Sequence, residues 1–109
     1  MAHPALRADA VAVVTGGAAG IGRAAAMEYA RRGMRVVVVD VRAELLDETE
    51  RALRAAGAAD VMVSATDVSD RAALVTLEAE VAERFGGTDI LMNNAGIQPG
   101  SQMLGPAEA

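Results

Sequence analysis

Apolar and amphipathic segments alternate along the chain. Four short apolar runs, bounded by glycine or polar residues, predict buried strands over Ala10–Thr15, Arg35–Asp40, Asp60–Thr66 and Asp89–Met92. Three segments between these runs carry apolar residues at spacings of three and four, and they predict helices over Ile21–Arg32, Ala43–Ala56 and Ser69–Phe85. Strands that alternate with helices in this way predict a parallel sheet joined by right-handed crossovers.

The order of these segments predicts an α/β fold with an incomplete, doubly wound parallel sheet. We expect about four strands, in the order 3-2-1-4, and three helices. The first two helices would cover one face of the sheet, and the third helix alone would cover the other. Part of that second face should therefore be bare and apolar, and the fourth strand should be an exposed edge. Both features favour self-association of the chain.

The length of 109 residues allows one domain. Residues 1–8 are predicted to be an N-terminal tail. Residues 97–109 are rich in Gly, Pro and Ser and predict a loop, with the first turn of a further helix at its end. We therefore expect a single, partial domain over residues 1–109.

Composition argues against several classes of protein. The net charge is −5, aromatic residues make up 2% of the chain and no basic stripe is present, which argues against nucleic-acid binding. The chain has no cysteine, which excludes disulfides and cysteine metal sites and fits a cytoplasmic location. We see no secretory leader, no apolar run near the ~18 residues of a membrane span, and no predicted metal site.

A glycine-rich turn connects the first predicted strand to the first predicted helix, with the sequence Thr15-Gly16-Gly17-Ala18-Ala19-Gly20-Ile21-Gly22. Gly16 would let the chain turn sharply, Gly20 would let a phosphate approach the backbone, and Gly22 would let the helix pack closely. The helix N-terminus would then offer N–H groups and partial positive charge to a pyrophosphate. A P-loop is excluded because no Gly-Lys-Ser or Gly-Lys-Thr follows.

Asp40 ends the second predicted strand, 20 residues after Gly20. A carboxylate at this position can accept hydrogen bonds from the hydroxyls of an adenosine ribose, and it repels a 2′-phosphate. We therefore expect NAD rather than NADP as the cofactor. Arg42 could attract a 2′-phosphate, but we interpret it as a solvated residue that opens a helix. The alternative role for Asp40 is that of a helix cap.

Asp67 and Val68 follow the third predicted strand. An acidic side chain at this point can accept a hydrogen bond from the exocyclic amine of an adenine. The alternative is that Asp67 or Ser69 caps the next helix, and both roles can hold at once.

The sequence Asn93-Asn94-Ala95-Gly96 follows the fourth predicted strand directly. Together with the glycine-rich turn, Asp40 and Asp67-Val68, it forms a set of four motifs in order that closely resembles the short-chain dehydrogenase/reductase family. This resemblance runs from about Ala8 to Ala109. It implies a Rossmann-type fold and hydride transfer between a nicotinamide dinucleotide, NAD or NADP, and an alcohol or carbonyl substrate.

The resemblance also implies roles for the matching residues. Those that would hold the pyrophosphate and the nearby ribose are Gly16, Gly20, Ile21 and Gly22. Asp40 would bind the adenosine ribose, and adenine would be flanked by Asp67 and Val68. The cofactor cleft would be lined by Asn94, Ala95 and Gly96, while Thr15 and Asn93 would tie the central strands together.

The family's catalytic residues are a serine, a tyrosine and a lysine, the last two in a Tyr-x-x-x-Lys arrangement. The chain contains no lysine, and its only tyrosine, Tyr29, lies within the first predicted helix. No catalytic residue is therefore predicted, and we expect a truncated, cofactor-binding half that is inactive by itself.

Two other classes of protein remain as alternatives. One is a non-catalytic nucleotide-binding or interaction module. The other is an S-adenosylmethionine-dependent methyltransferase, since that class also uses glycines after the first strand and an acid after the second. The Gly-x-x-x-Gly-x-Gly spacing and the Asn93–Gly96 segment count against the methyltransferase.

Overall fold

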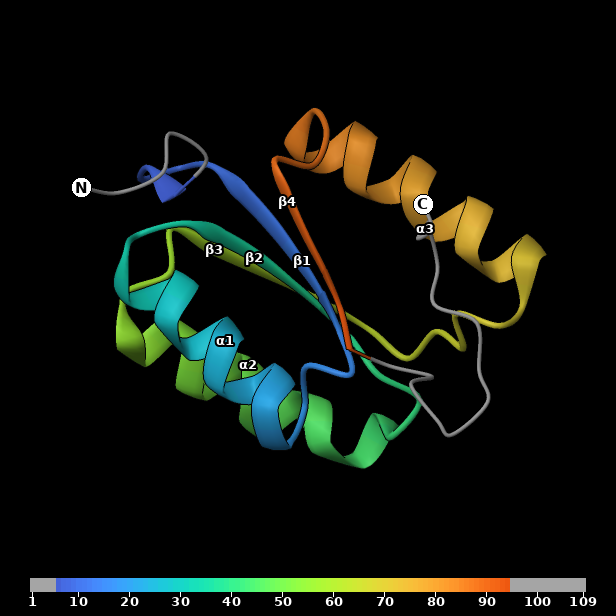
Figure 1. Cartoon of the computed structure of the whole chain (residues 1–109), viewed down its shortest axis with the longest axis horizontal. Helices are drawn as coiled ribbons and strands as arrows, with labels where there is room; N and C mark the ends of the chain where they lie inside the picture. The colour runs from blue at the N-terminus through green and yellow to red at the C-terminus, as the bar shows by residue number, and fades with distance from the viewer. Residues whose placement is uncertain (1–5, 95–109) are drawn as a thin grey trace.

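The computed structural model describes residues 6–94, in which strands and helices alternate (Figure 1). The elements in chain order are β1 (Val11–Thr15), α1 (Gly20–Arg31), β2 (Arg35–Val39), the 3₁₀ turn η2 (Ala43–Leu45), α2 (Leu46–Ala56), β3 (Asp60–Ser64), α3 (Arg71–Phe85) and β4 (Ile90–Asn93). The strands and helices predicted from the sequence are confirmed, with differences at their ends.

The four strands form one parallel sheet in the order β3-β2-β1-β4, which confirms the predicted topology. The register places Val13 of β1 between Val37 of β2 and Leu91 of β4. Because all strands run in the same direction, their carboxyl ends meet at one edge of the molecule. The segments that carried the candidate motifs all leave the sheet at that edge.

Helices lie on both faces of the sheet, with α1 and α2 on one face and α3 on the other (Figure 1). Side chains of a strand point alternately to the two faces. Val14, Val36 and Val38 accordingly pack in the core beneath α1 and α2. On the α3 face, Val13 and Val37 join Leu77, Val81 and Phe85 in a second core. The continuous valine run of β2 is thus explained by burial on both sides.

The start of α3 differs from the sequence prediction. Ser69 is not the N-cap, because the helix begins at Arg71 and the Asp70 carboxylate accepts a hydrogen bond from the Ala73 N–H at 3.1 Å. Ser69 instead donates its N–H and its hydroxyl to Oδ1 of Asp67, at 2.9 and 2.7 Å. This local turn commits Ser69 before the helix starts. The helix predicted from Ala43 likewise opens as the 3₁₀ turn η2.

The α3 face carries the predicted apolar opening. A groove of about 510 Å³ lies between α3 and β4, and its walls include Val13, Leu74, Leu77 and Leu91. Leu91 is 62% exposed. Within residues 6–94, β4 forms one edge of the sheet.

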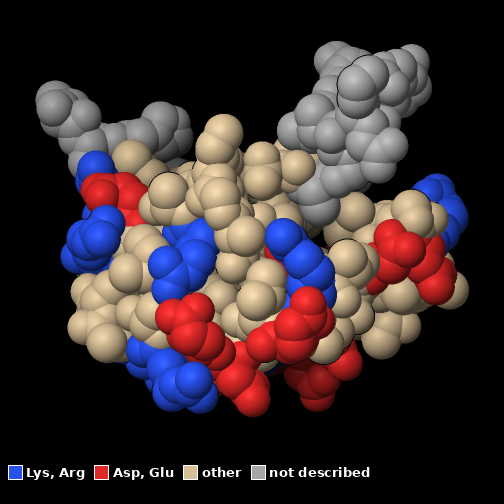
Figure 2. Space-filling model, turned by 90° about the horizontal axis from the view of Figure 1, so that it is seen from below, with Lys and Arg blue, Asp and Glu red and all other residues tan. Residues whose placement is uncertain are grey.

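The opposite face carries charged side chains on its outer side. Seen from the side of α1 and α2, acidic and basic side chains are intermixed (Figure 2). One ion pair joins the two helices, between Arg23 of α1 and Glu48 of α2 at 3.0 Å. In the part of the chain that the structure describes, no helix combines the length and apolar character needed to cross a membrane.

The described part of the predicted N-terminal tail contacts the sheet. Leu6 packs against Ala10, Ala12 and Met34, and Arg7 pairs with Asp89 at 3.7 Å. Residues 1–5 and 95–109 lie outside the described residues, and so does the loop predicted over 97–109.

Candidate functional site

A cavity of about 730 Å³ opens where the strands end, among the segments that follow β1, β2, β3 and β4. Seven of the predicted site residues line it: Gly16, Gly20, Ile21, Asp40, Asp67, Val68 and Asn94. Five further lining residues have no binding role in the sequence prediction: Ala19, Val41, Arg42, Thr66 and Ser69. Ala95 and Gly96 lie outside the described residues. The cavity thus gathers motifs that are far apart in the sequence.

The glycine-rich turn leaves β1 in a conformation that favours glycine. Gly16 has a φ of +67° and donates its N–H to the Val39 carbonyl at 2.7 Å, which anchors the turn to β2. Gly20 has a φ of +59°, and nothing lies within 4 Å of the position that a Cβ would take. Both values lie in the left-handed region that side chains disfavour. The backbone at Gly20 is therefore open to close approach from the cavity.

Gly22 lies behind the cavity wall. A Cβ at this position would lie 2.1 Å from the Gly16 carbonyl oxygen and 3.0 Å from Nδ2 of Asn94. The close approach predicted for Gly22 therefore exists, and its partner is the turn immediately after β1. Any side chain here would separate the first turn of α1 from the glycine turn.

The N-terminus of α1 is suited to an anion. Its N-cap residue is Ala19, no side chain caps it, and its first turn holds no acidic residue. The first N–H groups of a helix lack intrahelical partners and carry partial positive charge. Beside them, Ile21 and Val41, which are 73% and 63% exposed, line the cavity. The partial positive charge at the N-terminus of α1 thus lies beside the apolar residues Ile21 and Val41.

Asp40 is the buried charge of the site. Its side chain is 2% exposed. Oδ2 accepts a hydrogen bond from the Ala18 N–H at 3.1 Å, which ties the end of β2 to the glycine turn. Oδ1 accepts from the backbone N–H of Arg42 at 3.0 Å. The carboxylate therefore lies close to the backbone N–H groups of the turn.

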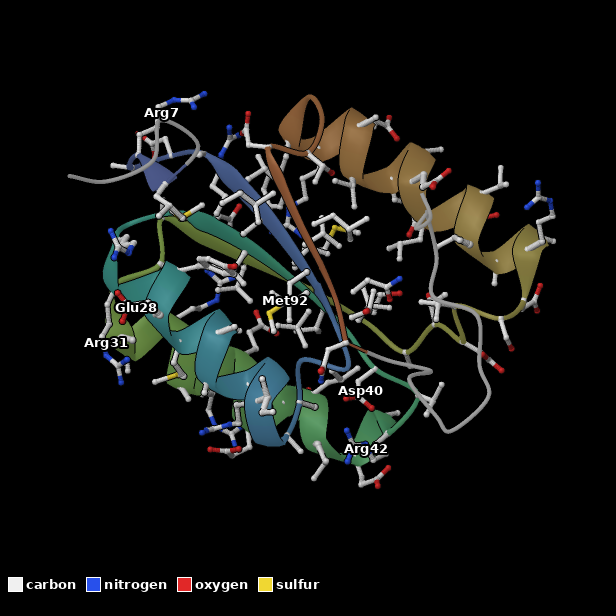
Figure 3. The ribbon with its side chains drawn as sticks, viewed as in Figure 1. Arg7, Glu28, Arg31, Asp40, Arg42 and Met92 are labelled. Carbon is white, nitrogen blue, oxygen red and sulfur yellow. The ribbon has the colours of Figure 1, made fainter. Side chains whose placement is uncertain are left out.

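The Arg42 side chain turns back onto Asp40 (Figure 3). Its Nε donates to Oδ1 at 2.8 Å and its Nη2 to Oδ2 at 2.7 Å, a bidentate ion pair. Arg42 does open the helical turn η2, as expected, but its half-exposed side chain is paired with Asp40 and is not simply solvated. Hydrogen bonds from the Arg42 guanidinium, opposed by burial, lower the pKa of Asp40 to about 2. The carboxyl group is therefore ionised at neutral pH.

Asp67 lines the part of the cavity predicted to hold adenine, and its side chain forms a local turn with Ser69. Its Oδ1 accepts both hydrogen bonds from Ser69, and the Ser69 hydroxyl is the main cause that lowers the pKa of Asp67. The alternative that Asp67 or Ser69 caps the next helix is wrong, because that cap is Asp70.

Thr15 joins the carboxyl ends of β1 and β4. Its Oγ1 donates to Oδ1 of Asn93 at 3.0 Å and accepts from the Asn94 N–H at 2.8 Å. The structure thus contains the link between Thr15 and Asn93 that the family resemblance implies. The same link holds Asn94 beside Gly22.

The arrangement suits a nucleotide diphosphate better than a metal ion. Backbone N–H groups can bind phosphate, a carboxylate can accept from sugar hydroxyls, and apolar side chains can contact a base. The volume lies within the range of about 300–1,000 Å³ that is usual for small-molecule sites. Among residues 6–94, no group of three or more potential metal ligands occurs. Tyr29 packs against the core and does not line this cavity.

Comparison with known proteins agrees with this geometry. The family model described as short chain dehydrogenase matches residues 10–108. Cis-4-hydroxycyclohexanecarboxylate dehydrogenase from Sinomonas cyclohexanicum is 49% identical over 90 residues, which cover 83% of this chain and 35% of that protein. This chain thus spans about a third of the length of that relative.

Solved structures share the fold. NAD⁺-bound xylitol dehydrogenase has a TM-score of 0.78 and 32% identity, over 84% of this chain and 35% of that one. A metagenomic short-chain oxidoreductase in complex with NADP has a TM-score of 0.78 and 37% identity, over 84% of this chain and 41% of that one. The cavity, the strand order and these matches lead to one conclusion. The chain belongs to the short-chain dehydrogenase family.

Proposed function

We propose that this chain binds the adenosine and pyrophosphate parts of a nicotinamide dinucleotide, and that it serves hydride transfer to or from an alcohol or carbonyl substrate in a longer protein. One observation carries the proposal. The Asp40 carboxylate lies 3.1 Å from the Ala18 N–H of the glycine turn, beside the uncapped N-terminus of α1. A group that can bind ribose hydroxyls and groups that can bind phosphate therefore share one cavity.

Each part of the cavity has a task in this proposal. The open backbone at Gly20 and the N-terminus of α1 bind the pyrophosphate. Asp40 binds the adenosine ribose, and Asp67 and Val68 flank the adenine. When bound, the nicotinamide ring supplies the carbon that gives or takes hydride. Asn94, which directly follows β4, borders the cavity on the β4 side.

We propose that the 109 residues do not catalyse hydride transfer by themselves. The chain has no lysine, and Tyr29 packs against the core on α1. A general acid or base must lie within hydrogen-bond reach of the proton it transfers. Tyr29 does not line the cavity, which supports the proposal. Incubation of the chain with NAD and a panel of secondary alcohols should give no increase in absorbance from NADH.

We propose NAD as the preferred cofactor. The negative charge at the end of β2 supports this choice, since a carboxylate accepts from a 2′-hydroxyl and repels a 2′-phosphate. Solved relatives of similar fold hold NAD⁺ in one case and NADP in another.

Calorimetry with ADP-ribose tests the binding proposal. We expect saturable binding to the 109-residue chain, weaker binding of 2′-phospho-ADP-ribose, and at least about tenfold weaker binding of ADP-ribose to Asp40→Ala. Arg31→Met is the matched control, because Arg31 lies on α1 and pairs with Glu28 at 3.7 Å, away from the cavity (Figure 3). Heats equal to those of buffer, from a chain shown to be folded, would contradict the proposed function.

We also propose that the isolated chain self-associates through β4, with a second copy of the chain as the partner. An edge strand offers unpaired N–H and C=O groups that an identical edge can satisfy. Leu91 and the adjacent groove add apolar surface. Sedimentation equilibrium should show a mass that rises with concentration, and Leu91→Lys should weaken the association. Val75→Lys, at another exposed apolar position on α3, is the control. A monomer at all concentrations would contradict this proposal.

A further inference from the structure

The carboxylate that the proposed function assigns to the adenosine ribose is covered. Its side chain is 2% exposed, while the side chain of Arg42 that lies over it is 46% exposed. A nucleotide that enters the cavity therefore meets the guanidinium before it meets Asp40.

All hydrogen-bonding positions of the carboxylate are filled. Oδ1 accepts from the Arg42 N–H and Nε, and Oδ2 accepts from the Ala18 N–H and the Arg42 Nη2. A carboxylate offers about four acceptor positions. A ribose hydroxyl can therefore bind Asp40 only if one of these donors leaves.

The four donors differ in how easily they can leave. The N–H groups of Ala18 and Arg42 belong to the backbone of two turns that flank the strand ends. The two guanidinium nitrogens sit at the end of a flexible side chain that is half exposed. The guanidinium is thus the donor that a ligand can displace, while the backbone N–H groups keep the carboxylate in place.

We propose that Arg42 is a specificity-determining residue that covers the adenosine-ribose subsite and is displaced by a ribose with free 2′ and 3′ hydroxyls. This inference rests on the proposed function. Each hydroxyl replaces one guanidinium hydrogen bond, one at each carboxylate oxygen. A ligand with a 2′-phosphate has no 2′ proton to donate, so it leaves Arg42 on Asp40 and meets a guanidinium that favours its charge. Arg42 therefore weakens NAD binding and supports NADP binding at the same site.

Substitution of Arg42 by methionine tests the inference, because it keeps the backbone N–H and the apolar stem and removes the guanidinium. Only molecules in which Arg42 has left Asp40 can bind the ribose, and the apparent affinity is reduced in proportion to the fraction of such molecules. We expect Arg42→Met to bind ADP-ribose about tenfold more tightly than the unaltered chain. Binding of 2′-phospho-ADP-ribose should weaken, so the preference for the unphosphorylated ligand should rise by more than about tenfold.

Two controls make the result specific. Arg31→Met removes the same charge from an ion pair with Glu28 and should change either affinity less than about twofold. Arg42→Met should raise the affinity for ADP but not the affinity for 2′,3′-dideoxy-ADP, because the dideoxy ligand has no 2′ or 3′ hydroxyl to donate to Asp40. Circular dichroism of each variant establishes that it is folded, and Arg42→Lys, which lacks the bidentate geometry, should show an intermediate gain.

The outcomes separate this inference from the proposed function. If the unaltered chain binds ADP-ribose and Arg42→Met binds it equally or more weakly, Arg42 is not a displaceable cover and the inference fails while the function stands. An equal gain for the dideoxy ligand would also overturn the inference. If neither folded protein binds ADP-ribose, the proposed function itself fails, and the inference fails with it.

Discussion

The two ends of the sheet differ in how far side chains cover the backbone. At the carboxyl end, the glycine turn leaves backbone exposed to a cavity, and the start of α1 has no side-chain cap. At the amino end, side chains close the structure. Oδ2 of Asp89 accepts from the Val11 N–H at 2.8 Å, and the guanidinium groups of Arg35 and Arg84 lie over the Phe85 ring at 5.2 and 5.1 Å.

The amino end also protects the edge of the sheet at β3. Arg54 from α2 and Arg84 from α3 both pair with Asp60, and both donate to the Val61 carbonyl at 3.1 and 3.2 Å. The Asp60 carboxylate and the Val61 carbonyl are thus paired within the chain. At the carboxyl end, the Arg42 side chain occupies the acceptor positions on Asp40 that the proposed ligand needs. Changes at the amino end should therefore affect stability alone, whereas changes at the carboxyl end should affect binding.

Gly22→Ala should have the largest effect. The new Cβ would lie 2.1 Å from the Gly16 carbonyl oxygen and 2.8 Å from its carbonyl carbon, and neither backbone atom can move without moving the turn. We expect a loss of about 3 kcal/mol in the free energy of unfolding. ADP-ribose binding should fall beyond detection, because the turn and α1 separate. Urea unfolding and calorimetry measure the two effects.

Gly86→Ala is the matched control for the amino end. Gly86 has a φ of +83° after α3, and nothing lies within 4 Å of its Cβ position. We expect a loss of about 1 kcal/mol in the free energy of unfolding, from backbone strain alone, and an unchanged nucleotide affinity. If Gly86→Ala weakened binding as much as Gly22→Ala, the two ends would not be separate in function.

Much of this contrast could be predicted from the sequence. Apolar runs rich in valine identify the strands, and the strand order follows from the alternation with helices. Because parallel strands end at one edge, the glycine turn, Asp40 and Asp67 could be placed together from the sequence alone. The position of Gly22 in the motif predicts close packing, and a Cβ at this position would meet the Gly16 carbonyl.

Side-chain conformations could not be predicted in this way. The ion pair of Arg42 with Asp40 depends on a rotamer that turns back over two residues, and spacing does not encode it. The shift of the α3 cap from Ser69 to Asp70 has a similar cause. Three neighbouring polar residues, Asp67, Ser69 and Asp70, could each start a helix, and the turn between the first two decides which one does.

The pH dependence of stability should be the second largest effect, and it belongs to the carboxyl end. The pKa of Asp40 falls from 3.8 to about 2 in the folded chain, chiefly through hydrogen bonds from Arg42. A lowered carboxyl pKa contributes stability above its unfolded value, and that contribution is lost as the pH falls through the folded value. Asp40 should therefore contribute about 2 kcal/mol above pH 5 that disappears between about pH 4 and pH 2.

Asp40→Asn isolates this contribution from that of other carboxylates. The difference in unfolding free energy between the unaltered chain and Asp40→Asn should shrink steadily as the pH falls from 5 toward the folded pKa of about 2. Urea titrations at several pH values measure it. A difference that stays constant across this range would show that the Asp40 ion pair does not stabilise the fold.

Asp89→Ala should have a smaller effect, limited to the amino end. The substitution leaves the Val11 N–H without its acceptor at 2.8 Å and removes the ion pair with Arg7 at 3.7 Å. We expect a loss of about 1.5 kcal/mol in the free energy of unfolding. Asp89→Asn keeps an acceptor for Val11 and should lose less than half as much. Affinity for ADP-ribose, measured by calorimetry, should be unchanged in both, and a marked loss of affinity would break the comparison of the two ends.

Arg84→Gln should have the smallest effect of this series. Nη2 of Arg84 contacts both carboxylate oxygens of Asp60 and the Val61 carbonyl, each at 3.2 Å, but the side chain is half exposed. Exposed ion pairs contribute little because water and salt screen them, and the contact with Phe85 adds a similar small amount. We expect a loss of about 0.5–1 kcal/mol that shrinks in 0.5 M salt as the screening length falls. Arg84→Lys keeps the charge but not the planar contact with Phe85, so its loss should persist in salt. If both variants lost the same free energy of unfolding with the same salt dependence, the contribution of Arg84 at the β3 edge would come from charge alone.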